Sequence, residues 1–101
     1  MSASQRLHEL GLTLPPVPTP AAAYVPAVRT GQYVWTAGQL PVVDGRLPVT
    51  GKVGDGAGLV PPDVAKDLAR TAALNALAAV AEQAGSLDRV ARVVKVIGYV
   101  A

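Results

Sequence analysis

The chain has 101 residues, of which half are apolar and 16% are charged, and this suits one globular domain and is too short for two. Nine basic and seven acidic residues are interleaved along it, and no basic stripe typical of a nucleic-acid groove stands out. The absence of cysteine and the single histidine exclude a disulfide framework, a thiolate nucleophile and a cysteine- or histidine-rich metal site.

The N-terminal region predicts a short helix followed by an extended segment. No basic-then-apolar leader and no run of about 18 apolar residues occurs, so we expect a soluble cytoplasmic protein with no membrane contact. A helix is predicted over residues 4–10, with Ser2 or Ser4 as its N-cap, and Gly11 would end it. The prolines of residues 14–20 predict an extended path over the surface.

Two β-prone runs, residues 24–29 and 33–37, come next. Thr30-Gly31 separates them, and a glycine at that point supplies the positive φ that a tight hairpin requires, so the two runs are predicted to pair antiparallel. Trp35, on the second run, is expected in the core or in an interface because it contributes a large apolar area.

A region rich in turns follows the hairpin. Asp44-Gly45 is a second turn signal and predicts a minor hairpin between residues 40–43 and 46–48. Residues 51–58 contain four glycines and predict a loop. This loop does not resemble a phosphate-binding loop, because no Lys-Ser/Thr pair follows the last glycine.

A long helix is predicted over residues 62–84. Pro62 suits the first turn, Asp63 complements the positive end of the helix dipole, and Gly85 supplies the stop. Asn75, in the middle of this helix, is expected to be structural, either hydrogen-bonding across a subunit contact or facing water. One side of the helix is expected to carry Val64, Leu68, Ala72, Ala76, Ala79 and Val80.

The chain ends with a predicted capped turn at residues 86–89 and a predicted strand over residues 91–100. Both faces of that strand are mostly apolar. One face would present Val93, Ile97 and Tyr99, and the other Val94, Val96 and Val100. A strand of this kind is covered on both sides, and a single helix covers one, so a partner subunit or a further segment is expected on the other.

This order of elements resembles the RidA/YjgF family, also labelled endoribonuclease L-PSP. The resemblance rests on Ala23-Tyr24-Val25, on the stretch TAGQLP at residues 36–41, and on residues 81–100, and it runs from about Ala22 to Val100. It implies an α+β fold of the chorismate-mutase-like, bacillar type, with a long helix packed on one face of a sheet that is incomplete at the C-terminus. Residues 1–101 would form one such domain. Its parts would be residues 1–21, the helix and proline-rich segment, and residues 22–101, the hairpin, loop, long helix and strand.

The resemblance also implies a function. Family members form homotrimers with clefts between subunits, and hydrolyse enamines and imines such as 2-aminoacrylate, released by pyridoxal-phosphate enzymes, to 2-keto acids and ammonia without a metal or other cofactor. A 2-imino acid, a 2-enamino acid or a related carboxylate is therefore the expected ligand. Carried over by matching positions, the candidate substrate-binding residues are Tyr24, Ala37, Gly38 and Gln39.

The match to the family breaks at three points. Ala37 stands where many members have serine, and Ala22-Ala23 replaces a Gly-Pro pair. The arginine that binds the substrate carboxylate and the glutamate that handles water would lie beyond Ala101, so no catalytic residue is assigned. A second chain could supply them.

Other interpretations stay open at this point. Tyr24 could be an ordinary strand aromatic, and Gly38 could end a strand where only a small residue fits. His8 is expected to be solvated. A non-catalytic trimeric module that binds small carboxylates is the alternative function. An RNA-cleaving or translation-inhibiting role, suggested by Arg89, Arg92 and Lys95, is disfavoured because a ribonuclease needs a positioned acid and base, and a nucleic-acid partner is not expected.

Overall fold

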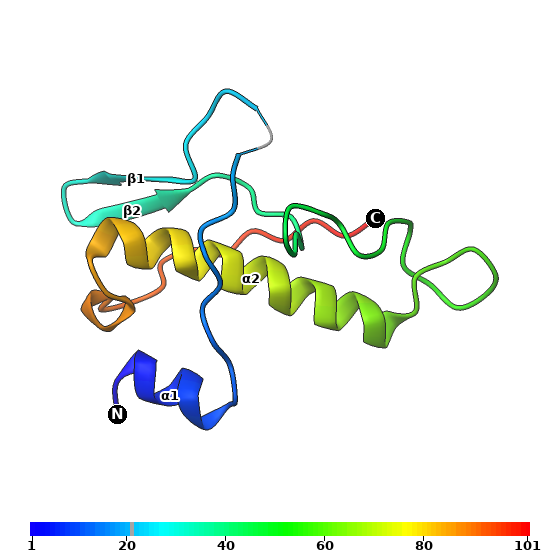
Figure 1. Cartoon of the computed structure of the whole chain (residues 1–101), viewed down its shortest axis with the longest axis horizontal. Helices are drawn as coiled ribbons and strands as arrows, with labels where there is room; N and C mark the ends of the chain where they lie inside the picture. Colours follow the sequence, from blue (N-terminus) through cyan, green and yellow to red (C-terminus); the bar gives the residue numbers. More distant parts are fainter. Residues whose placement is uncertain (21) are drawn as a thin grey trace.

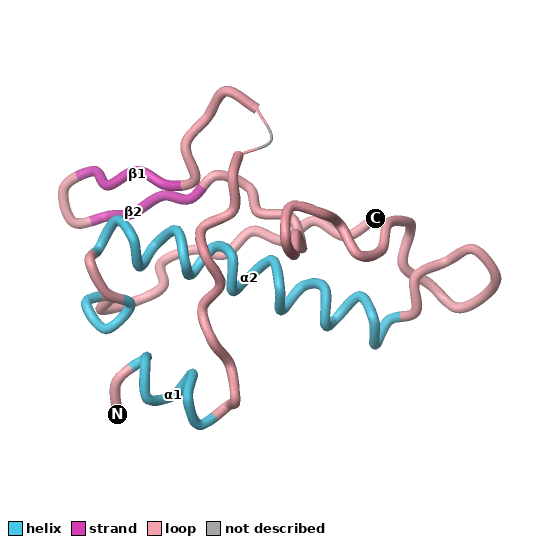
Figure 2. The backbone as a smooth tube through the Cα atoms, viewed as in Figure 1, coloured by secondary structure: helices cyan, strands magenta, loops and turns pink. Residues whose placement is uncertain are grey.

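The fold is a two-stranded antiparallel hairpin backed by one long helix (Figure 1), as seen in a computed structural model that describes residues 1–20 and 22–101. Residue 21, the last of the predicted N-terminal segment, lies outside the described residues. Figure 2 shows that most of the remaining chain is irregular. In chain order the elements are α1 (Ala3–Glu9), β1 (Ala27–Thr30), β2 (Tyr33–Thr36), α2 (Pro62–Ala84) and the single 3-10 turn η1 (Leu87–Arg89).

Helix α2 has the bounds that its local signals predict. Pro62 occupies the first turn, where its missing N–H costs nothing, and Gly85 closes the helix at a φ of 88°, which favours glycine. Its buried residues are Asn75, Ala78 and Ala79, so the small side chains let the hairpin approach closely. The side of the helix that was predicted to be apolar includes Ala79 but not the two other buried residues.

The hairpin is confirmed, with a shorter first strand than predicted. Val28 pairs with Trp35 and Thr30 with Tyr33, and Gly31 in the turn has a φ of 59°. Tyr24 lies in a bend ahead of β1, so the interpretation of Tyr24 as a strand aromatic is wrong. Tyr24 lies outside the strand because prolines and bends precede β1. Just before β1, the Pro26 carbonyl still accepts a hydrogen bond from the Ala37 N–H at 2.8 Å.

The two faces of the hairpin differ in burial. Ala27 is buried on the side that contacts α2, whereas Val28, Tyr33 and Trp35 lie exposed on the other side and are called the hairpin patch below. The rings of Tyr33 and Trp35 have centroids 6.3 Å apart. Trp35 is 60% exposed, so its expected place in the core is wrong, because the single long helix covers the opposite face. Its place in an interface stays a prediction.

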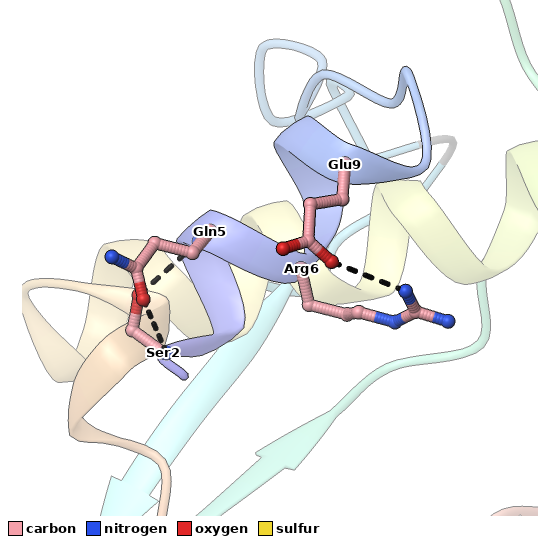
Figure 3. Close-up of polar contacts among 4 residues, drawn as sticks. All are labelled: Ser2, Gln5, Arg6 and Glu9. Atoms are coloured by element: carbon pink, nitrogen blue, oxygen red, sulfur yellow. Dashed lines mark hydrogen bonds and ion pairs between the residues drawn. The ribbon is translucent and has the colours of Figure 1, made fainter.

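Helix α1 is capped as predicted. The Ser2 side chain accepts from the Gln5 N–H, the Gln5 side chain accepts from the Ser2 N–H, and Arg6 pairs with Glu9 at 3.3 Å (Figure 3). The helix is attached to η1 by the Ser4 N–H, which donates to the Asp88 carboxylate at 2.8 Å. This contact joins the N-terminal region to the far end of α2.

The prediction of a strand over residues 91–100 is wrong. The segment carries no assigned secondary structure and every residue in it is exposed. Figure 1 shows it leaving η1 and running to the C-terminus behind α2. A strand requires a hydrogen-bonded neighbour, and within the described chain residues 91–101 form one backbone bond, from the Val53 N–H to the Ala101 carbonyl at 2.9 Å.

The connections between the hairpin and α2 are turns, as predicted. Around Asp44-Gly45 the predicted minor hairpin is reduced to one bridge, between Val43 and Arg46. The glycine-rich residues 51–58 form an irregular loop, closed by a bridge between Val53 and Val60. Among the described residues, no helix combines the length and the apolar composition of a membrane span.

Candidate functional site

An open, mostly apolar hollow of about 470 Å³ lies beside the exit of β2. It is lined by Tyr24, Ala37, Gly38, Gln39, Leu40 and Tyr99. The structure therefore brings together all four residues that were predicted to bind substrate, from a bend before β1 and from the segment after β2. Their role in binding stays a prediction.

The segment after β2 is held in place by Asn75. Its side-chain amide nitrogen donates to the Leu40 carbonyl at 3.0 Å and to the Val42 carbonyl at 3.1 Å, and the residue is 1% exposed. The structural role expected for Asn75 is present, but its partners are backbone carbonyls of the same chain, not a subunit contact or water. The clamp fixes the stretch that includes Gly38 and Gln39 between the end of β2 and the long helix.

Gly38 is a glycine that the fold itself does not require. A Cβ placed on it would meet no atom within 4 Å, and its φ lies outside the positive range that favours glycine. The structural interpretation, that only a small residue fits here, is therefore wrong for the described chain. Within that part of the molecule the Gly38 N–H also makes no hydrogen bond, so a donor without a side chain in its way is available at the hollow.

Two tyrosines from distant parts of the chain line this hollow. Tyr24 is 43% exposed and Tyr99 is 93% exposed. Sequence reasoning placed Tyr99 on an apolar strand face and did not include it in the site. Its alternation with Ile97 predicted that both residues lie on one face of a strand. No local signal could show that residue 99 lies near residues 37–40.

A smaller hollow of about 40 Å³ adjoins the first and is bordered by the proline-rich segment. Pro18, Thr19 and Pro20 line it together with Tyr24 and the Gly38–Leu40 stretch. Prolines restrict the backbone, so this part of the extended segment forms a stiff rim beside the candidate site.

The chemistry of the lining favours binding over proton transfer. The described residues that line the larger hollow include no His, Asp, Glu, Lys or Arg, and the two phenols are its titratable groups. In the described part of the chain, no group of three or more His, Cys, Asp or Glu residues is placed to hold a metal ion. His8 is exposed on α1, away from the lining, as expected. A reaction at this hollow would thus need an acid, base or fixed charge from outside it.

Comparison with known proteins gives the same picture of the fold. No protein-family model matches the chain. Protein TCP17 of Trypanosoma cruzi is 36% identical over 94 residues, which cover 93% of this chain. The crystal structure of a protein from Shewanella oneidensis MR-1, named a "putative endoribonuclease", superposes with a TM-score of 0.76 at 30% identity over 88% of this chain. The chain spans 57% of the length of each of these two proteins.

A hairpin backed by one long helix, with a hollow at the exit of β2, defines this chain as an α+β domain of the L-PSP fold. The sequence identity that accompanies the structural match goes further than fold. The chain resembles, in sequence as well as in fold, a structural neighbour of the YjgF/L-PSP (RidA) family.

Proposed function

We propose that this chain forms part of an enzyme that hydrolyses short 2-imino and 2-enamino acids to 2-keto acids and ammonia. The observation that carries the proposal is Gly38: it lines the hollow, its N–H makes no backbone hydrogen bond within the described chain, and neither packing nor backbone conformation there calls for glycine. A close approach of a ligand to the backbone is the remaining physical reason for a residue without a side chain. The proposal places this activity in the cytoplasm.

In this proposal the residues of the hollow bind and orient, and other groups supply charge. The Gly38 N–H would donate to the substrate carboxylate, and the rings of Tyr24 and Tyr99 would contact the apolar part of the substrate. An arginine and a glutamate from outside these 101 residues would fix the carboxylate and activate water. Because a held charge contributes much of the transition-state stabilisation, the 101-residue chain alone should be inactive.

Assembly is part of the same proposal. The hairpin patch exposes three large side chains on one sheet face, and such patches mark association sites. We expect homotrimers, with the patch of each copy covered by its neighbour. Sedimentation equilibrium of the native protein measures the mass directly, and a monomeric mass at micromolar concentration would contradict this part of the proposal.

The activity is tested by competition for a short-lived imine. Amino-acid oxidase generates a 2-imino acid in situ, semicarbazide captures what remains, and a deaminase lowers the semicarbazone yield. We expect the native assembly to lower that yield, and the Gly38→Ala variant to lose the effect. Gly98→Ala is the matched control, because Gly98 also has open space at its Cβ position but lies outside the hollow.

The alternative function is a non-catalytic module that binds small carboxylates. The absence of acidic and basic side chains among the described lining residues, together with Ala37, favours it. In that case the native assembly would bind pyruvate in a calorimeter and leave the semicarbazone yield unchanged. RNA cleavage, named for the Shewanella neighbour, has less support because the hollow contains no positioned acid or base. Incubation with end-labelled RNA tests it, and we expect intact RNA.

A further inference from the structure

The smaller hollow beside the candidate site has walls that the fold holds in place. Its volume is about 40 Å³, and its described lining comes from residues 18–42. Three of the lining residues are prolines, whose rings lock the backbone φ: Pro18, Pro20 and Pro26. The Asn75 amide fixes two further lining residues, because it donates to the Leu40 carbonyl at 3.0 Å and to the Val42 carbonyl at 3.1 Å. The hollow is therefore a preformed space of set size.

The smaller hollow is continuous with the candidate site through shared lining. Residues common to both hollows are Tyr24, Gly38, Gln39 and Leu40. Gly38, whose N–H is the donor proposed for the substrate carboxylate, thus borders both of them. In a 2-imino acid the side chain is attached to the same carbon as the carboxylate. A carboxylate held at the Gly38 N–H therefore brings the first atoms of the substrate side chain to the edge of the smaller hollow.

The lining of the smaller hollow suits a short hydrocarbon chain. No described residue that lines it carries a charge, and its surface includes three proline rings and the side chains of Leu40 and Val42. Carbon atoms gain binding free energy in such surroundings, whereas an ionic group would lose its water without a counter-charge. A space of about 10–15 Å³ accommodates one water-sized group, so a volume of about 40 Å³ accommodates about three.

We propose that the smaller hollow receives the side chain of the substrate and selects unbranched chains of about two or three carbon atoms over branched ones. Thr19 and Val42 set this limit, because they line the smaller hollow alone and, unlike the other described residues that do so, are not prolines. The inference rests on the proposed function in one respect, the place of the carboxylate at Gly38. The non-catalytic alternative uses the same carboxylate site, so a binding measurement tests the selection in either case.

The test uses 2-keto acids, the stable products of the proposed reaction, as ligands of the native assembly in a calorimeter. The series is pyruvate, 2-oxobutyrate, 2-oxopentanoate and 4-methyl-2-oxopentanoate, whose side chains are methyl, ethyl, propyl and isobutyl. Each methylene group removed from water strengthens binding about fourfold, so we expect that gain from pyruvate to 2-oxobutyrate. Affinity should fall at least about tenfold from 2-oxobutyrate to 4-methyl-2-oxopentanoate, because a branched chain overfills the fixed space.

Two variants with matched controls locate the selection. Thr19→Trp places a large ring at the smaller hollow and should remove the gain of 2-oxobutyrate over pyruvate. Thr13→Trp should keep that gain, because Thr13 is exposed in the same extended segment and lines neither hollow. Val42→Ala enlarges the space and should raise the affinity for 4-methyl-2-oxopentanoate at least about tenfold, whereas Val43→Ala, outside both hollows, should not. Since Thr19 is exposed, the first pair is informative even if Val42→Ala weakens the fold.

The proposal is overturned if the four acids bind with equal affinity or if none of them binds. It is also overturned if Thr19→Trp leaves the order of affinities unchanged. Failure of the proposed function gives a different result. A native assembly that binds the acids in the expected order but leaves the semicarbazone yield unchanged keeps the side-chain selection and loses the deaminase activity. One that hydrolyses imines while binding all four acids equally does the reverse.

Discussion

The side-chain amide of Asn75 lies 3.0 Å from the Leu40 carbonyl, joining the middle of α2 to a residue 35 positions earlier in the chain. This contact, with its companion to Val42, is the link that sets the segment after β2 against the helix. The position of the candidate site therefore depends on one amide that is far from it in sequence.

Removal of this amide should be costly. In Asn75→Ala two backbone carbonyls lose their donor in a buried place, so we expect the free energy of unfolding to fall by about 2–3 kcal/mol. Urea unfolding followed by helical circular dichroism measures it. Thr71→Ala, which removes a side-chain bond to the Asp67 carbonyl within the same helix, is the control and should change stability by less than about 0.5 kcal/mol. Equal losses in the two variants would show that the clamp contributes little.

Gly38→Ala should separate stability from binding. The added methyl group meets open space at a permitted φ, so the free energy of unfolding should stay the same or rise by up to about 1 kcal/mol. Gly85→Ala, at a φ of 88°, should instead destabilise the chain by about 1 kcal/mol. Thermal melts of both variants provide the comparison. A clear loss of stability in Gly38→Ala would mean that the fold, and not a ligand, requires this glycine.

Trp35→Ala should have a small effect on the isolated chain and a larger one on assembly. Since the indole is 60% exposed, we expect about 1 kcal/mol of destabilisation at concentrations where the chain is monomeric. Association through the hairpin patch should weaken at least tenfold, measured by sedimentation. Leu10→Ala, at the end of α1 and 52% exposed, is the control and should leave association unchanged. A weakening shared by both variants would remove the patch from the interface.

The contact between α1 and η1 should depend on pH. The Ser4 backbone N–H, and secondarily the Ser4 side chain, donate to Asp88 and lower its pKa below the ordinary value of 3.8. Because the pKa is lower in the folded state, the stabilisation is complete above about pH 4 and is lost as the pH falls below 3.8 toward the folded value. Hydrogen exchange of the α1 amides should rise over that range. Asp88→Asn should abolish this dependence, and Asp44→Asn, in the second turn, should preserve it.

Local signals predicted the elements that local chemistry decides. The bounds of α2 follow from Pro62 and Gly85, and the cap of α1 follows from Ser2 and Gln5, because each of these acts within one turn of its own position. The grouping of Tyr24 with Gly38 came from the family resemblance, and no periodicity in the sequence would have supplied it.

The wrong predictions concern which other part of the molecule packs against a given residue. Hydrophobicity predicted Trp35 in the core or in an interface, and the core was wrong because hydrophobicity cannot tell which face of a hairpin a single helix will cover. The alternating apolar side chains of residues 91–100 are typical of a strand. A strand also needs a hydrogen-bonded neighbour to form a ladder, and the alternation does not reveal one. The partners of Asn75 were missed for a related reason, since they lie in a loop more than 30 residues away.

The open segment after η1 has a consequence for the life of the protein in a cell. Proteases and chaperones recognise extended apolar chain, and residues 91–100 present it even when α2 and the hairpin are fully folded. Turnover of the unassembled chain should therefore be governed by access to this segment rather than by the thermodynamic stability of the helix and hairpin.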